Sequence, residues 1–279
     1  MKKLFTIMII LIIASAVFAE GVFSFRGAGA FDLTAYQTPK NVTQVPVFAQ
    51  KVSLDRVPIR GMGFGFDAGL ELKLSEEICL YGDFSMTFPS KVKIDDDHEV
   101  TRDSLDEMTK IIKDMYSDHS DIEVNAFLTT VSAHLGFARA LNLGDSPFRL
   151  NIGGGVGYTR TSVGDKTTMV KANTLYHMDD YHVLSSLSAD LYVNAAYKLG
   201  NHFSVGAVIM PGFVFFSSSK LYCTVESEYS DTCVPVPSNQ YYSTDSESKW
   251  QTGMKPKYEN SGFCAGFSLN TAIGITYHF

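Results

Sequence analysis

Positive charge is scarce in this sequence, and no stretch of it is basic. Lysine and arginine total 23 against 30 aspartates and glutamates, and the formal net charge is −7. A nucleic-acid-binding surface needs clustered lysine and arginine to neutralise phosphates, so we expect no nucleic-acid partner. Only 19% of the residues are charged and 45% are hydrophobic, which excludes a disordered polar chain.

Cysteine is also rare. The chain has four cysteines, and none of them has the CxxC spacing of a zinc site, so we expect no metal and no cofactor. Cys223 and Cys233 lie close together in a polar stretch. In an oxidising compartment we expect them to form a disulfide, and two free thiols are the alternative.

The N-terminus has the features of a removable export signal. Lys2 and Lys3 precede an apolar run from Leu4 to Ile13, and Val17-Phe18-Ala19 places small residues at the −3 and −1 positions of a cleavage site. A membrane anchor is the alternative, but the run is shorter than the roughly twenty residues that span a bilayer. We therefore expect a signal peptide over residues 1–19 and one domain over residues 20–279.

Two weakly charged stretches, 199–219 and 260–279, are long enough to suggest transmembrane helices, but the second alternates with a period of two. Its odd positions are bulky and mostly apolar, whereas its even positions are small or polar. A helix would spread both sets around its surface, and a strand separates them. The same period predicts eight strands: Gly21–Leu33, Gly61–Leu74, Ile78–Phe88, about Ile122–Ala140, Phe148–Tyr158, Val183–Leu199, Phe203–Phe216 and Asn260–Phe279.

The connections between these strands alternate in length. Short turns at 75–77, 142–147 and 200–202 alternate with long connections at about 34–60, 89–121, 162–182 and 217–260. Strands with one apolar face, short turns at one end and long loops at the other are typical of an antiparallel up-and-down transmembrane β-barrel. A water-soluble sandwich is the alternative, but it gives no reason for all long loops to share one end. Cys79 and Cys264 start strands at opposite ends of this barrel, so we expect both to be free.

The alternation places charged side chains on the inner face of the barrel. An eight-stranded lumen is barely wider than its own side chains, so these charges must pair across it or contact water. Their mixed signs predict a packed interior with salt bridges. The expected lumen charges are Asp67, Glu71, Lys73, Asp83, Arg149, Asp190 and Lys198.

At this point the chain resembles the small eight-stranded outer-membrane barrels of the OmpX, OmpA-domain and OmpW group. The resemblance is sharpest in the last strand, where Ile273, Ile275, Tyr277 and a C-terminal Phe279 alternate. In such families this pattern resembles the signal that the barrel-assembly machinery reads. The resemblance implies a monomer in the bacterial outer membrane, surrounded by outer-membrane lipid, with extracellular loops and periplasmic termini.

The long connections hold two further features. Ser104 and Glu107 have capping-box spacing, and apolar residues at helical spacing follow, which predicts one short helix in the loop 89–121. The helix is either an interaction surface or lid, or a loop that packs its own apolar stripe. The last loop carries aromatic residues that are typical of binding surfaces, although aromatic girdles use the same residue types. These binding candidates are Tyr222, Tyr229, Tyr241, Tyr242 and Trp250.

Two short motifs raise the alternative of an outer-membrane hydrolase. Asp180-x-His182 resembles the Asp–His pair of omptin proteases, and His202-x-Ser204 resembles the pair of a lipid A deacylase. The omptin barrel has ten strands, and the second motif lies at the short-turn end, so we expect no enzyme. The expected function is adhesion or binding of a host or other extracellular ligand through the surface loops, with a structural role. A narrow, OmpW-like channel for small, mainly hydrophobic solutes is the alternative.

Overall fold

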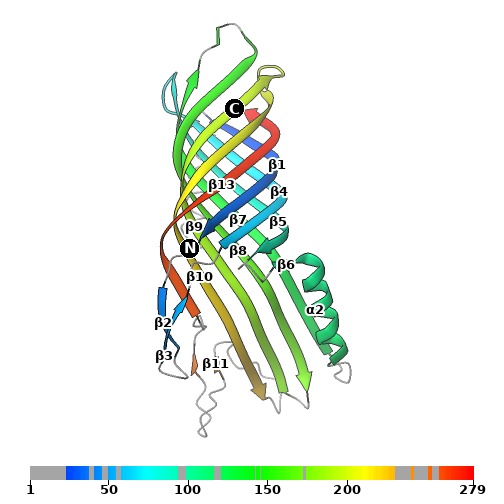
Figure 1. Cartoon of the computed structure of the whole chain (residues 1–279). Helices are drawn as coiled ribbons and strands as arrows, with labels where there is room; N and C mark the ends of the chain where they lie inside the picture. Colours follow the sequence, from blue (N-terminus) through cyan, green and yellow to red (C-terminus); the bar gives the residue numbers. More distant parts are fainter. Residues whose placement is uncertain are drawn as a thin grey trace.

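The chain folds into a closed antiparallel barrel in a computed structural model (Figure 1). The residues described are 23–37, 41–45, 50–54, 58–93, 99–115, 121–141, 143–144, 146–171, 174–229, 240–241, 251–252 and 258–279. The predicted signal peptide, residues 1–19, lies outside them. Among the described residues, no helix is long and apolar enough to span a membrane.

Eight strands form the barrel wall, which confirms the predicted fold class. They are β1 (Phe23–Gln37), β4 (Pro58–Lys73), β5 (Ile78–Lys93), β7 (Asp121–Leu141), β8 (Phe148–Lys171), β9 (Thr174–Lys198), β10 (Phe203–Tyr229) and β13 (Tyr258–His278). Each pairs with its neighbour in the chain, and β1 also pairs with β13, for example Leu33 opposite Leu269. This last pairing closes the sheet, so β1 and β13 do not remain as unpaired edge strands.

The short elements lie at one end of the barrel. They are the hairpin β2 (Asn41–Val45) and β3 (Gln50–Leu54), strand β6 (Glu99–Thr101), helix α2 (Arg102–Met115), and the pair β11 (Gln240–Tyr241) and β12 (Gln251–Thr252). Short turns join the strands at the opposite end, the upper end in Figure 1. One turn uses Gly200, whose φ of 149° lies in a region that L-residues with a side chain rarely adopt.

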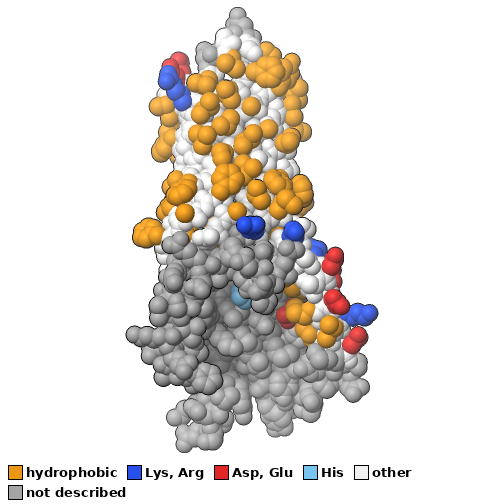
Figure 2. Space-filling model, viewed as in Figure 1, with side chains coloured by type: hydrophobic (Ala, Val, Ile, Leu, Met, Phe, Trp, Pro, Cys, Tyr) orange, Lys and Arg blue, Asp and Glu red, His pale blue; other side chains and the backbone are white. Residues whose placement is uncertain are grey.

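Apolar side chains cover the half of the barrel next to the short turns on the face that Figure 2 shows, and all eight wall strands contribute exposed apolar residues to this belt. Phe64 is 69% exposed, Phe137 58% and Ile273 71%. The inner face has the opposite character, since its buried residues include many serines, threonines and aspartates. A barrel with large apolar side chains outside and polar ones inside has its favourable environment in a bilayer, which makes this an outer-membrane type of barrel.

The strands run farther than the sequence pattern predicts. Residues 162–171 and 174–182 of the segment expected as a long loop are instead paired strand, because β8 and β9 stay in register from Phe148 opposite Tyr197 to Lys171 opposite Thr174. Beyond the belt the outer face has no lipid to meet, so the alternation of apolar and polar residues fades. Threonine and other β-branched residues still favour extended backbone there, and the pairing continues.

Candidate functional site

The structure places the seven predicted lumen charges in two different environments. Asp67, Glu71, Asp83 and Asp190 are buried inside the barrel, and Arg149 is partly buried. Lys73 and Lys198, in contrast, are exposed. Both lie at the last residue of a strand, next to a short turn, where a long side chain reaches water instead of the lumen.

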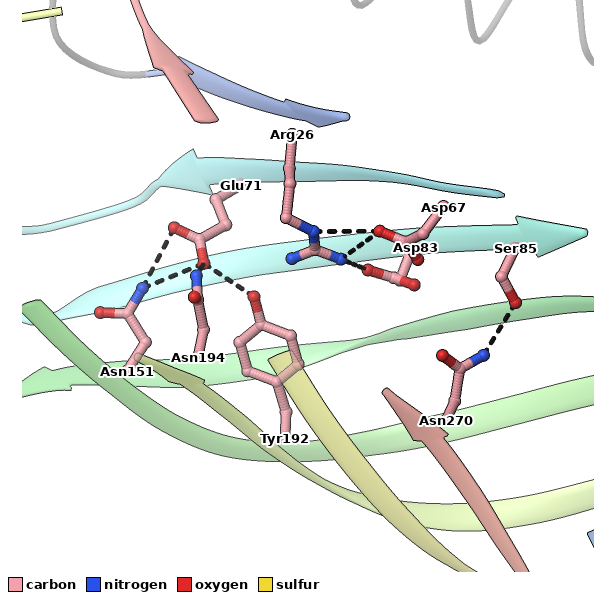
Figure 3. Close-up of polar contacts among 9 residues, drawn as sticks. All are labelled: Arg26, Asp67, Glu71, Asp83, Ser85, Asn151, Tyr192, Asn194 and Asn270. Atoms are coloured by element: carbon pink, nitrogen blue, oxygen red, sulfur yellow. Dashed lines mark hydrogen bonds and ion pairs between the residues drawn. The ribbon is translucent and has the colours of Figure 1, made fainter. Parts of the chain in front are cut away.

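Glu71 is the centre of a hydrogen-bond network at the short-turn end of the lumen (Figure 3). Its carboxylate accepts hydrogen bonds from Asn151 Nδ2 at 3.0 and 3.1 Å, Asn194 Nδ2 at 2.6 Å and Tyr192 OH at 2.8 Å. Arg149 adds a contact at 3.2 Å. The donors come from β8 and β9, so this network ties one side of the barrel to β4 through the lumen.

Arg26 forms a second bridge, between β4 and β5. Its guanidinium donates to Asp67 Oδ1 from Nε at 3.0 Å and from Nη2 at 2.7 Å, and Nη2 also contacts Asp83 (Figure 3). All three side chains are buried. One guanidinium thus serves two carboxylates.

An apolar layer lies beside these networks. The rings of Tyr81 and Tyr192 are stacked with their centroids 3.9 Å apart. Cys79, Ala138, Val208 and Met210 pack around them, and all six residues are at least 97% buried. We call this set the short-turn layer. Together with the Glu71 network it fills the lumen at that end.

Polar side chains occupy the lumen on the side of the short-turn layer that faces away from the short turns. Asn270 Nδ2 donates to Ser85 Oγ at 2.8 Å across the lumen, as Figure 3 shows. His134 Nδ1 lies 2.7 Å from Asp190 Oδ2, and Ser132 Oγ lies 3.0 Å from Thr159 Oγ1. We call this level the polar layer.

A second apolar layer follows, farther from the short turns. Its buried members come from most of the wall strands and from α2; they are Tyr36, Val92, Leu105, Leu128, Val163, Leu184 and Val214, with Cys264 packed against them. We call this set the long-loop layer. The lumen is therefore apolar, polar and apolar again along its axis.

The wall has one interruption at the level of the long-loop layer. Strands β5 and β7 pair from Ile78 opposite Arg139 to Thr87 opposite Thr130, and their pairing ends there although both strands continue. Beyond this point β5 pairs with β6 instead, from Lys91 opposite Thr101 to Lys93 opposite Glu99. Pro89 lies at this point of β5, next to an irregularity in the register with β4. Proline cannot donate a hydrogen bond to a neighbouring strand, which fits the change of partner.

Helix α2 covers this gap. Leu105 is only 5% exposed and belongs to the long-loop layer together with Val92 of β5 and Leu128 of β7. Arg102 Nη2 lies 3.5 Å from the carbonyl of Leu128, on the strand that has lost its partner. Leu105 therefore reaches from outside the sheet to the lumen side chains, and we call the interruption that it fills the β5–β7 gap.

The structure corrects the predicted cap of this helix. The capping residue is Thr101, not Ser104: Ser104 N–H donates to Thr101 Oγ1 at 3.0 Å, and Thr101 N–H donates to Ser104 Oγ at 2.9 Å. The reciprocal bonds have capping-box geometry, but they begin three residues earlier, because serine at this position replaces the usual glutamate as the returning partner.

The described side chains show the surroundings of one of the two hydrolase motifs. Ser204 Oγ lies 2.9 Å from Nε2 of His278, and His202 Nδ1 contacts the backbone carbonyl of His278 at 3.2 Å. Ser204 and His202 therefore both contact His278 instead of each other. Asp180 lies in β9, but its side chain is outside the described part of the structure.

The remaining sequence predictions divide by location. Cys79 and Cys264 are free, as predicted. The side chain of Cys223 and the whole of Cys233 lie outside the described residues, as do the side chains of all five aromatic binding candidates. Ile273, Ile275 and Phe279 are exposed on the outer face and Tyr277 is partly buried against Phe203, which places the predicted assembly signal on the lipid side.

Several residues of the lumen networks were missed. Three of them donate to the Glu71 carboxylate, namely Asn151, Tyr192 and Asn194. The fourth, Asn270, donates to the Ser85 hydroxyl. None of the four carries a formal charge, so the search for charged inward residues did not find them. Each lies on the inner side of its strand in the alternating pattern. Amides at inward positions near an inward glutamate were the available signal.

Comparisons with known proteins add a fold-level likeness only. No known protein family matches the sequence, and no curated protein matches it. The chain is similar to the outer membrane protein OprG from Pseudomonas aeruginosa, with 10% identity, 93% of this chain and 96% of OprG covered, and a TM-score of 0.47. It is also similar to Ail, the attachment invasion locus protein of Yersinia pestis, with 10% identity, 94% of this chain and 100% of Ail covered, and a TM-score of 0.36. A third similar structure is the outer membrane protease OmpT from Escherichia coli, with 10% identity, 92% of this chain and 97% of OmpT covered, and a TM-score of 0.38. At these scores the architecture of this chain rests on its own strand pairing, which is that of a small outer-membrane barrel.

Proposed function

We propose that this outer-membrane barrel passes small hydrophobic molecules between its long-loop end and the bilayer, sideways through the β5–β7 gap. We also propose that the long-loop end faces the outside of the cell and that the termini are periplasmic. The single observation that supports this function is the interrupted pairing of β5 and β7 beside an apolar layer inside the lumen.

A route along the whole barrel axis is unfavourable for any solute. It would have to cross the stacked rings of Tyr81 and Tyr192 and then the network around Glu71, which is held by four donors. A hydrophobic solute would also lose favourable contacts in the polar layer, because buried polar groups need hydrogen-bond partners. On the far side of the polar layer from the short turns, the long-loop layer is the only apolar environment in the described lumen. The β5–β7 gap opens from this layer.

The gap also has a suitable cover. A closed sheet is held by backbone hydrogen bonds, and separating two paired strands costs all of them. Within the described parts of β5 and β7, the pairing does not continue beyond Thr87 and Thr130, and side chains of α2 make the contact instead. Moving a short helix by a few ångströms therefore opens the wall without breaking the barrel.

The experiment is uptake of a lipophilic fluorescent dye into liposomes that contain the protein. A cysteine pair, Val92→Cys with Leu105→Cys, staples α2 to β5 when oxidised and releases it when reduced. The matched control has Leu105→Cys alone, and both proteins carry Cys264→Ser because the free Cys264 packs against the same layer. Oxidation should abolish dye uptake by the stapled protein, reduction should restore it, and the control should not respond.

A second variant distinguishes the sideways route from an axial one. Glu71→Gln loosens the network at the short-turn end, so an axial channel would conduct faster, whereas sideways passage should be unchanged. Uptake that ignores the staple and responds to Glu71→Gln would refute the proposal.

Partner binding by the projecting end is the second candidate. Strands β8, β9 and β10 are 24, 25 and 27 residues long, more than twice the roughly 9–11 residues that span a bilayer, so a paired wall projects well beyond the belt. Such a wall is a rigid support for a binding surface. Removing residues 230–239 should abolish binding to a bacterial or host cell surface while heat-modifiable gel migration stays intact, and unchanged binding would count against this role.

A further inference from the structure

The polar layer has more negative than positive charge. Asp32 and Asp190 lie in this layer with one basic group, His134, and the Arg26 guanidinium elsewhere in the lumen serves both Asp67 and Asp83. Over these four carboxylates and two basic groups, the formal charge is −2 even when His134 is counted as protonated. Buried charges are very costly unless they are paired or bind a cation, and this layer is enclosed by the apolar short-turn and long-loop layers.

Some of the oxygens in this layer lack a partner. Asp190 Oδ1, Ser268 Oγ and Asn270 Oδ1 are buried and make no hydrogen bond within the described part of the chain. All three residues are at least 94% buried. Native proteins rarely leave buried oxygens without a donor, so each of them points to a ligand.

The backbone brings these oxygens together. In the strand register Gly212 of β10 lies opposite both Asp190 of β9 and Ser268 of β13. A Cβ on Gly212 would stand 2.5 Å from Ser268 Oγ and closer still to Asp190 Oδ1. The glycine therefore leaves room for two oxygens from strands on either side of it to approach each other.

Asp32 and Asn270 complete the group. They are directly opposite each other in the β1–β13 register, two residues along β13 from Ser268. The amide of Asn270 is oriented by its hydrogen bond to Ser85 Oγ at 2.8 Å, which turns Oδ1 away from Ser85. His134 holds the other oxygen of Asp190 at 2.7 Å, so Oδ1 of Asp190 has a defined direction.

We propose that the polar layer binds one hydrated divalent cation, Mg²⁺ or Ca²⁺, through the oxygens of Asp190, Ser268, Asn270 and Asp32. Carboxylate, amide and hydroxyl oxygens are the ligands of these hard cations, and one such ion balances the two excess charges. Within the described residues no three His, Cys, Asp or Glu side chains are close enough to make a complete metal cage. The ion therefore keeps part of its water shell, as Mg²⁺ commonly does with one or two carboxylates. This site is independent of the β5–β7 gap and of the proposed transport.

The test uses the purified full chain in detergent, stripped with EDTA and then returned to Mg²⁺, Ca²⁺, or Na⁺ at matched ionic strength. At one hundred times the dissociation constant, either divalent ion should raise the unfolding midpoint by roughly 5–10 °C relative to Na⁺. Equilibrium dialysis with radioactive Ca²⁺ should find one tightly bound ion per chain. A midpoint that responds only to ionic strength would overturn the proposal and would indicate that the carboxylates are neutralised by protons.

The variants separate this site from other acidic parts of the chain. Asp32→Asn removes a charged ligand and should weaken Ca²⁺ binding at least about tenfold. Ser268→Ala removes one oxygen and no charge, so it should weaken binding less and provides the test if Asp32→Asn does not fold. Asp103→Asn, an exposed acid of α2, is the matched control and should bind as the wild type does. Substitution of Asp95, Asp96 and Asp97 by asparagine should also leave binding unchanged, and loss of the divalent effect in that variant would refute the lumen site.

Discussion

Removing the Glu71 carboxylate should destabilise the barrel more than any surface change. Glu71→Ala deletes the acceptor of Asn151, Asn194 and Tyr192, all buried, and of the partly exposed Arg149. A buried donor that loses its acceptor costs about 1–3 kcal/mol. Three such donors give about 3–9 kcal/mol, and relaxation of the side chains lowers this, so we expect a loss of about 3–6 kcal/mol.

The matched control is another glutamate that pairs with arginine. Glu77 contacts Arg139 at 2.7 Å, but both side chains are more than 60% exposed. An exposed ion pair contributes about 0–1 kcal/mol, so Glu77→Ala should change the free energy of unfolding by no more than that. The distance is shorter than that between Glu71 and Arg149, so the expected difference comes from burial and from the three additional donors of Glu71.

The assay is urea unfolding in lipid vesicles, followed by far-ultraviolet circular dichroism and by heat-modifiable migration on gels. The free energies of Glu71→Ala, Glu77→Ala and the wild type are compared at a common urea concentration. If Glu71→Ala falls within about 1 kcal/mol of the wild type, the four contacts do not hold the lumen closed, and the reasoning about the short-turn end fails.

Three further predictions concern the lumen and the helix. Arg26→Met leaves Asp67 and Asp83 facing each other without a cation, so in the same urea assay it should lose about 3–5 kcal/mol and Asp83→Asn should lose less. A Cβ on Gly157 would lie 2.6 Å from both His134 Nδ1 and Ser188 Oγ, and Gly157→Ala should therefore lower the free energy of unfolding by about 1–3 kcal/mol. Thr101→Ala removes the cap of α2, at a cost of about 1 kcal/mol, and hydrogen exchange should accelerate in residues 102–115 while exchange in β8 and β9 stays slow.

The barrel itself was predictable because lipid imposes a strict pattern. In the belt, each residue faces either hydrocarbon or a crowded lumen, and the period of two is therefore visible in strands such as β13. The projecting parts of β8 and β9 were missed for the complementary reason. In this part of β8, the alternate residues Ser162, Gly164 and Lys166 on one face are no more apolar than the residues between them on the other face. The pattern that identified the strands was therefore absent, although the backbone pairing continued.

The site was predictable only in part. Alternation placed Glu71, Asp83 and Asp190 on the inner face, but it assigns a side and not a partner. Arg26 reaches Asp67, 41 residues away in the chain, because β1 and β4 are neighbours only in the closed sheet. The β5–β7 gap was not predictable at all, since it depends on β6 replacing β7 as the partner of β5, and a short segment such as 99–101 has no periodicity of its own.

The lumen is most tightly closed where the belt surrounds it and least tightly closed where the wall is interrupted, and the two facts have a common physical cause. Inside the belt every backbone group must pair within the sheet, so the wall there has no freedom and side chains such as Glu71 and Tyr192 can be held in fixed contact across it. At the border of the belt water can satisfy unpaired backbone groups, and β5 and β7 can separate at little cost. The gap can therefore open only at this level, next to the long-loop layer. A structure of the stapled Val92→Cys, Leu105→Cys protein should show the belt and the Glu71 network unchanged, and a barrel that distorts down to the Glu71 network on release of the staple would contradict this division of the wall.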